Sequence, residues 1–203
     1  MVEVNYYGNK ERRDKERWKP AIAELSPFVG RSYDTFSCLF GVRDYVPFEP
    51  VAPQRGFPEN VTDLVRDRAW TDVGENGEYK SGFECHDATY VTLEELKNVD
   101  WDEESEGLDR RVAVVDDDGD YRFKAAYISG MKDLTDEQMQ RLNNGENVEW
   151  GETDDGKRYL KRLRPTRRSV LSGAWEYLIF ELMDKLGERF GDENVRLVVW
   201  FDN

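Results

Sequence analysis

The most unusual local group of anion-binding side chains in the sequence lies between positions 157 and 168. Seven basic residues fall in this segment, namely Lys157, Arg158, Lys161, Arg162, Arg164, Arg167 and Arg168. A guanidinium group donates paired hydrogen bonds to phosphate or carboxylate oxygens, and Tyr159 could stack on the ring of a ligand. The segment therefore indicates either a phosphate-bearing ligand or an acidic surface on a partner. The alternative, which is the usual role of a charged run, is neutralisation by the chain's own carboxylates.

Three further arginines accompany the first predicted helix and the loop that follows it. Arg31 and Arg43 bracket the helix, and Arg55 lies in a proline-rich loop, a kind of segment that often carries binding residues. An alternative for Tyr33, Asp34 and Arg43 is a buried, salt-bridged support of the fold. The side chains predicted to contact a ligand are Arg31, Tyr33, Arg43, Arg55, His86 and Arg164.

His86 is the only histidine, and its neighbours suggest two kinds of chemistry. With Asp87 or Glu84 as the orienting carboxylate, it could act as the general base of a small hydrolase. A hydrogen-bonding structural role is the alternative, because no partner motif surrounds it. Zinc binding by Cys85 and His86 is not expected, since adjacent residues on a strand point to opposite faces. In addition, no second cysteine pair or histidine completes a tetrahedral set.

The aspartate-rich segment 116–120 does not match a calcium-binding loop. With Gly119 at the sixth loop position, Val114 and Ala125 would occupy the first and last ligand positions, and neither side chain offers a carboxylate. The segment instead predicts a polar hairpin turn. The sequence also lacks the motifs of phosphate-binding loops, dinucleotide-binding folds, serine hydrolases and zinc proteases. We therefore predict no catalytic residue, no metal and no cofactor.

The overall charge restricts the partners. The chain has 203 residues, with 43 Asp and Glu against 29 Lys and Arg, and a formal net charge of −14. This balance argues against duplex nucleic acid and against an anionic membrane as partners. It permits a small anionic ligand in a locally basic pocket, or a host protein. Two cysteines form no disulfide framework and no signal sequence is visible, so we expect a cytoplasmic location, with self-association left open.

Helical and strand periodicities alternate without the repeated strand–helix–strand order of a parallel sheet. Capping boxes begin helices after Thr92 and Thr135, and turn residues close hairpins near Gly119 and Gly156. The other predicted elements are a strand at 2–7, a helix at 31–43, an extended loop at 47–58, a short helix capped by Asn60, a long helix at 168–190 ended by Gly191, and a strand at 194–201.

Hydrophobic residues make up 38% of the chain and aromatic residues 13%, so we expect a folded core of large side chains inside a polar shell. The predicted architecture is one α+β domain over residues 1–203, with a mixed or antiparallel sheet. A long C-terminal helix is followed by a final sheet strand. Residues 10–30 and 72–84 are predicted to be irregular surface segments.

Four short segments of the chain resemble four sequence motifs, and they occur in the same order along the chain as those motifs do. Residues 31–43 resemble R-N-Y-D-x-F-x-x-L-x-x-V-R, with Ser32 in place of the Asn, and residues 53–58 resemble P-R-G-L-P. Residues 86–101 resemble H-S-x-x-L-T-L-x-E-L-x-x-x-D-W, and residues 194–203 resemble V-R-[IL]-V-x-W-F-D-N. These patterns are typical of an uncharacterised family of small proteins encoded by bacteriophages and prophages. The resemblance implies a phage accessory protein, and it implies no reaction.

Three functions follow as hypotheses. The first is a non-enzymatic phage protein in the host cytoplasm that counters host defence by sequestering a phosphorylated, nucleotide-like ligand between arginines and aromatic rings. The second is an acidic inhibitor that binds a host protein by imitating nucleic-acid phosphates. The third is a small hydrolase that uses His86.

Overall fold

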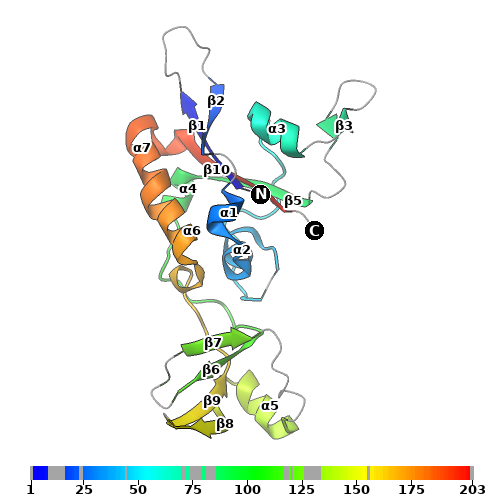
Figure 1. Cartoon of the computed structure of the whole chain (residues 1–203), viewed down its shortest axis with the longest axis vertical. Helices are drawn as coiled ribbons and strands as arrows, with labels where there is room; N and C mark the ends of the chain where they lie inside the picture. The colour runs from blue at the N-terminus through cyan, green and yellow to red at the C-terminus, as the bar shows by residue number, and fades with distance from the viewer. Residues whose placement is uncertain are drawn as a thin grey trace.

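The computed structural model describes residues 2–8, 17–22, 25–43, 45–69, 72–73, 79–80, 86–116, 119, 121–125, 134–154 and 156–201. It has an α+β fold in which two four-stranded antiparallel sheets lie at opposite ends of an elongated molecule (Figure 1). Most of the helices accompany the first sheet, and one helix accompanies the second. No helix in the described ranges has both the length and the apolar character needed to cross a membrane.

The first sheet joins strands from both ends of the sequence. Its strand order is β2 (Arg17–Ile22), β1 (Val2–Gly8), β10 (Val195–Phe201) and β5 (His86–Thr92), and all neighbours are antiparallel. All seven residues of β10 are buried, as predicted from its apolar residues on both faces. One face packs on helices through a large apolar core. The predicted final strand therefore forms the middle of this sheet.

The helices on this face are α1 (Ser26–Val29), α2 (Tyr33–Phe40), α4 (Leu93–Lys97), α6 (Gly173–Tyr177) and α7 (Asp184–Phe190). A π-helical segment, Leu178–Met183, joins α6 to α7. The long helix was predicted to begin at Arg168, which is wrong. Residues Arg168–Val170 form a separate 3-10 turn, and Leu171 is extended before Gly173 starts the helix. The apolar stripe identifies the buried face but does not mark this break.

Helix α2 is shorter than the predicted helix 31–43. Gly41 has a φ of 70°, which glycine adopts without strain, and its amide donates to the Ser37 carbonyl at 3.0 Å. The bond from the Gly41 amide to the Ser37 carbonyl is that of an αL helix ending, and the Val42 amide donates to the Phe36 carbonyl at 3.2 Å. Arg43 therefore lies beyond the helix, in the turn that follows it.

The opposite face of the first sheet carries a buried polar network. Glu3 is 1% exposed and accepts hydrogen bonds from Asn5 Nδ2 and, at 2.7 Å, from Thr62 Oγ1. Arg196 is 4% exposed, and its Nε donates to Asn5 Oδ1 at 3.3 Å, while its guanidinium lies 3.8 Å from the Trp18 ring centroid. Burial lowers the pKa of Arg196 to about 10, so the guanidinium keeps its charge at neutral pH. Asn5 therefore links a buried anion to a buried cation.

Helix α3 (Asp63–Ala69) covers this network together with the apolar residues Val65, Val198 and Trp200. Asn60 was predicted to cap this helix, but Thr62 does so, because its hydroxyl accepts from the Val65 amide at 3.2 Å. The loop at 47–58 has neither helix nor strand, as its four prolines predicted.

The second sheet has the order β7 (Tyr121–Ala125), β6 (Val112–Val115), β9 (Gly156–Lys161) and β8 (Val148–Thr153). Both predicted hairpins and both predicted capping boxes are present. Helix α5 (Asp136–Asn143) packs Leu142 against Val114 and Leu160. This core is separate from the core of the first sheet.

Two extended segments connect the sheets side by side. Glu104 and Thr166 form an antiparallel bridge, and the Asp109 amide donates to the Leu163 carbonyl at 2.8 Å. Arg111, whose Nη2 lies 2.7 Å from Asp109 Oδ2, also pairs with Asp34 on α2. The second sheet is thus tied to the first both by the backbone and by an ion-paired arginine.

The two segments predicted to be irregular contain short regular elements. Strand β2 and helix α1 fall within residues 10–30, whereas 9–16 and 23–24 lie outside the described residues. Residues 72–84 include the two-residue strands β3 (Asp72–Val73) and β4 (Tyr79–Lys80), and the remainder of that segment lies outside the described residues.

Stability at alkaline pH is expected to depend on Cys38 of α2, which is fully buried beside Val46, Phe48 and Val170. Burial raises the pKa of its thiol to about 11, although Arg167 acts in the opposite direction. The unfolded thiol ionises at lower pH, so its stabilising contribution is full below pH ~9 and disappears as the pH rises towards ~11. We expect the free energy of unfolding, measured with urea, to fall by about 2 kcal/mol between pH ~9 and pH ~11. Cys38→Ala should lack this component, and equal pH slopes for both proteins would contradict the assignment.

Candidate functional site

The first candidate site is a pocket of about 290 Å³ where α1, α2 and the following turn meet β5 and β10. We call it the Arg–His pocket. It is lined by Val2, Ser26, Val29, Gly30, Arg31, Tyr33, Phe36, Val42, Arg43, His86, Val199 and Phe201. Four of the six side chains predicted from the sequence to contact a ligand are in this set. They come from two segments that lie more than forty positions apart in the chain.

The base of the Arg–His pocket is apolar and aromatic. Phe201, at the end of β10, packs edge-to-face on Phe36 of α2 with ring centroids 5.0 Å apart. His86, at the start of β5, stacks on Phe201 with centroids 6.0 Å apart and an angle of 28° between the rings. The strand pairing places Phe201 opposite His86, so the sheet register brings these two rings together. Such a base suits a flat ring.

Arg31 and Arg43 supply positive charge to the pocket, and both are exposed. The Arg43 guanidinium lies 5.6 Å from the centroid of the Tyr33 ring. Neither arginine pairs with a carboxylate in the described part of the chain, and no carboxylate is among the lining residues. In a chain of net charge −14, this leaves two guanidinium groups available to an external anion.

The Arg–His pocket has two unusual local features, which are positive φ angles at or beside it and a buried hydroxyl without a hydrogen-bond partner. Within the described ranges, Arg43 (φ 61°) and Asp87 (φ 49°) are the two non-glycine residues with positive φ, and Asp87 is the hydrogen-bond partner of the pocket residue His86. Such conformations cost about 1–3 kcal/mol each and concentrate at functional sites. In addition, Ser26 Oγ is buried with no hydrogen-bond partner. A ligand with a polar group could satisfy it.

The two remaining predicted residues lie elsewhere. Arg55 is held by its own surroundings, because its Nη1 pairs with Glu95 at 2.7 Å, its Nη2 donates to the Val51 carbonyl at 3.0 Å, and its guanidinium lies 5.8 Å from the Tyr90 ring centroid. This arginine supports the proline-rich loop and does not line the Arg–His pocket. Arg164 lines a different cleft, described next.

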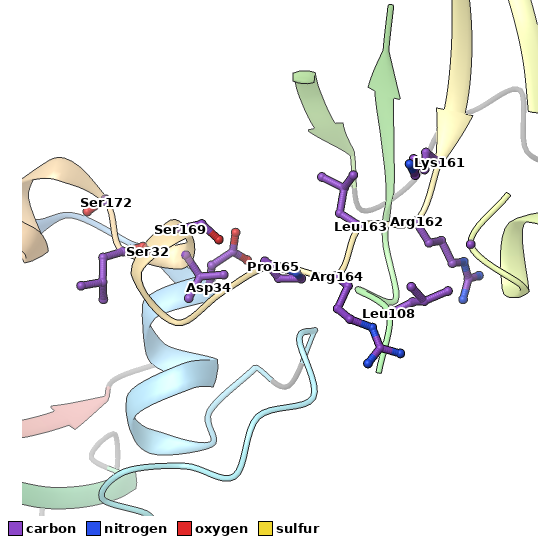
Figure 2. A pocket seen from close by; sticks show the side chains of 13 residues that line it. Ser32, Asp34, Leu108, Lys161, Arg162, Leu163, Arg164, Pro165, Ser169 and Ser172 are labelled. Carbon is purple, nitrogen blue, oxygen red and sulfur yellow. The ribbon is translucent and has the colours of Figure 1, made fainter. Parts of the chain in front are cut away.

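The second candidate site is a cleft of about 820 Å³ between the two sheets, along the segments that connect them (Figure 2). We call it the basic cleft. It is lined by Ser32, Asp34, Leu108, Gly145, Lys161, Arg162, Leu163, Arg164, Pro165, Ser169, Val170, Leu171 and Ser172. The two alternatives for the basic segment 157–168 both apply in part. Lys157, Arg167 and Arg168 pair with Glu149, Glu103 and Glu176, whereas Lys161, Arg162 and Arg164 line the cleft.

The alternative role for Asp34, a salt bridge with Arg43, is not what the structure has. Asp34 pairs with Arg111, while Arg43 lies against Tyr33. Tyr159, which was considered as a stacking ring for a ligand, is absent from the lining of the basic cleft and pairs across the sheet with Val115.

His86 has the carboxylate partner that the hydrolase hypothesis requires, since its Nδ1 lies 2.6 Å from Asp87 Oδ2. Glu84 and Cys85 lie outside the described residues, as do three of the positions 116–120. Among the residues that are described, no group of three or more His, Cys, Asp or Glu side chains is arranged to hold a metal ion.

Sequence reasoning missed Ser26, Phe36 and Phe201 as pocket residues. Phe36 and Phe201 were recognised only as apolar members of a helix and a strand. Ser26 is one serine before a proline, and nothing in the sequence distinguishes it. No protein-family model, curated protein or solved structure matches the chain, so the phage resemblance stays a prediction.

Proposed function

We propose that this protein binds a phosphorylated, nucleotide-like small molecule in the Arg–His pocket without transforming it. The observation that carries the proposal is the meeting of Arg31 and Arg43, both without a carboxylate partner in the described ranges, with the His86 and Tyr33 rings over an aromatic base. The volume of about 290 Å³ lies near the lower end of the range for small-molecule sites, and it favours one nucleotide over a dinucleotide.

In this proposal the two arginines bind the phosphate, and the nucleobase of the ligand packs against the rings of Phe201, His86 and Tyr33. Ser26 Oγ, which has no internal partner, supplies one directional hydrogen bond. The resemblance to phage proteins supports sequestration of such a ligand during infection as the biological purpose. Removal of a signal requires tight binding and no turnover, which agrees with the absence of a recognisable catalytic motif in the sequence.

The proposal is tested by isothermal titration calorimetry with cyclic and linear mononucleotides, dinucleotides and the unphosphorylated nucleosides. We expect binding of a phosphorylated member and none of its nucleoside. Arg31→Gln and Arg43→Gln should each weaken binding about tenfold or more, because each removes a charge-assisted hydrogen bond.

Arg55→Gln is the matched control. This variant removes the same charge from an arginine that does not line the pocket, and its affinity for the nucleotide should equal that of the unmodified protein. No heat with any of the nucleotides, or equal losses in all three variants, would contradict the proposal.

A second candidate function is hydrolysis, which the 2.6 Å contact between His86 Nδ1 and Asp87 Oδ2 favours, because it orients the imidazole as in a general base. Prolonged incubation with the bound nucleotide, followed by chromatography, distinguishes the two. Product formation that disappears in His86→Ala would support hydrolysis, and recovery of intact ligand supports binding alone.

A further inference from the structure

The basic cleft lies between two separately built parts of the molecule. Lys161 and Arg162 end β9 or follow it directly, and Arg164 lies in the segment that returns towards the first sheet. Ser169 and Ser172 face the cleft from the turn before α6, on the side of the first sheet (Figure 2). The cleft therefore has donors at both of its ends.

The charge of the cleft is unusual for this chain. Lys161, Arg162 and Arg164 form no ion pair within the described residues, although the same basic segment contains three residues that do. Among the described residues, Asp34 is the one carboxylate that lines the cleft, and it pairs with Arg111. Three cations without an ion-pair partner among the described residues, in a chain with 43 acidic side chains, indicate a local positive potential.

Two polar atoms at the cleft are buried and have no hydrogen-bond partner. They are Arg162 Nε and Ser172 Oγ, and they belong to opposite sides of the cleft. A buried polar group without a partner costs about 1–3 kcal/mol, and it is commonly completed by a ligand or an ordered water. By contrast, Ser169 Oγ already donates to the Thr166 carbonyl at 2.8 Å. The incomplete donors are thus confined to two residues.

The spacing of the arginines indicates how the ligand lies. Arg162 and Arg164 are two positions apart in an extended segment, so their side chains leave it on the same side, and Figure 2 shows them extending in a common direction. The Arg164 guanidinium makes one long contact, 3.4 Å from its Nη1 to the Ser105 carbonyl, and retains its other donors. Two neighbouring guanidinium groups suit two linked phosphates.

We infer that the basic cleft is a second ligand site, independent of the Arg–His pocket, and that it binds an oligophosphate. A chain of linked phosphates fits a cleft of about 820 Å³ with donors at both ends better than a single phosphate ion does. Arg162 and Arg164 bind the phosphates on the side of the second sheet with Lys161 adding charge, and Ser172 donates from the side of the first sheet.

The experiment is a calorimetric titration of the full chain with inorganic tripolyphosphate, inorganic phosphate and a nucleoside triphosphate. Tripolyphosphate should bind at least tenfold more tightly than phosphate. Arg162→Gln and Arg164→Gln should each weaken tripolyphosphate binding about tenfold or more, and Ser172→Ala by a smaller factor. A nucleoside triphosphate that binds no better than tripolyphosphate identifies the phosphate chain as the recognised group.

Two controls separate this site from general charge and from the Arg–His pocket. Arg168→Gln removes the same charge from the same segment, but Arg168 pairs with Glu176 and should leave affinity unchanged. Arg43→Gln should also leave tripolyphosphate binding unchanged, so the two sites fail independently. Lack of tripolyphosphate binding, or equal weakening by Arg168→Gln and Arg164→Gln, would overturn the inference. If Arg162→Gln fails to fold, Arg164→Gln carries the test.

Discussion

Replacing Arg196 with methionine should lower the free energy of unfolding by about 3–5 kcal/mol, because it removes the buried cation from a polar network that also contains a buried carboxylate. Arg196 lies on the central strand and is 4% exposed, and Glu3 on the neighbouring strand is 1% exposed. Asn5 donates to Glu3 and accepts from Arg196. Without the guanidinium, the Asn5 side-chain oxygen loses the Arg196 donor, and the buried Glu3 carboxylate loses a nearby positive charge.

The double variant Glu3→Leu/Arg196→Met tests this explanation. The double variant removes both buried charges together, so it should be less destabilised than the sum of the single variants by about 1–3 kcal/mol. Urea unfolding followed by circular dichroism measures all four free energies. Additive single effects would mean that Arg196 acts through packing on Trp18 alone.

Trp175→Ala should cost about 3–5 kcal/mol, the range for removing a large buried aromatic side chain. Trp175 has no exposed surface, and its ring packs edge-to-face on Phe36 and Phe40 at centroid distances of 5.9 and 6.1 Å. It therefore joins α6 to α2 in the core of the first sheet. Because Phe36 also forms the base of the Arg–His pocket, Trp175→Ala should additionally weaken the proposed binding of a nucleotide.

Two comparison variants give this prediction its controls. Tyr177→Ala changes a side chain on the same helix that is 49% exposed, and it should cost less than about 1 kcal/mol. Trp175→Phe keeps an aromatic ring and removes the indole Nε1, which is buried without a hydrogen-bond partner. It should cost clearly less than Trp175→Ala in thermal and urea unfolding. Equal losses for the Phe and Ala variants would assign the effect to the indole shape.

Local rules of the sequence predicted much of the fold. Thr92 and Thr135 cap their helices because a hydroxyl and a carboxamide or carboxylate at fixed spacing satisfy backbone groups without help from distant residues. The same holds for the hairpins at Gly119 and Gly156. The division into two sheets was not predicted, because strand alternation reveals which face is buried but not which other strand is the neighbour.

The candidate sites, like the fold, could be predicted only where neighbouring residues in the sequence determine the structure. Arg31, Tyr33 and Arg43 were recognisable because charged and aromatic residues at the ends of one helix remain close in space. Arg55 was predicted to bind because it lies in a proline-rich loop, yet Glu95, forty positions later, pairs with it. Whether an arginine is available to a ligand depends on such distant partners, which no local pattern records. Ser26 was beyond prediction, since only the packed structure shows that its hydroxyl has no partner.

The β-bridge between Glu104 and Thr166 has a topological consequence. The stretch between these two residues begins and ends at one place, and none of its described residues belongs to the large core around Trp175 and β10. The second sheet is therefore an insert with its own apolar core, which is joined to the rest of the molecule at its two ends and through the contact of Arg111 with Asp34. Variation in its length or sequence would reshape one wall of the basic cleft while the Arg–His pocket, which is built entirely outside the insert, kept its form.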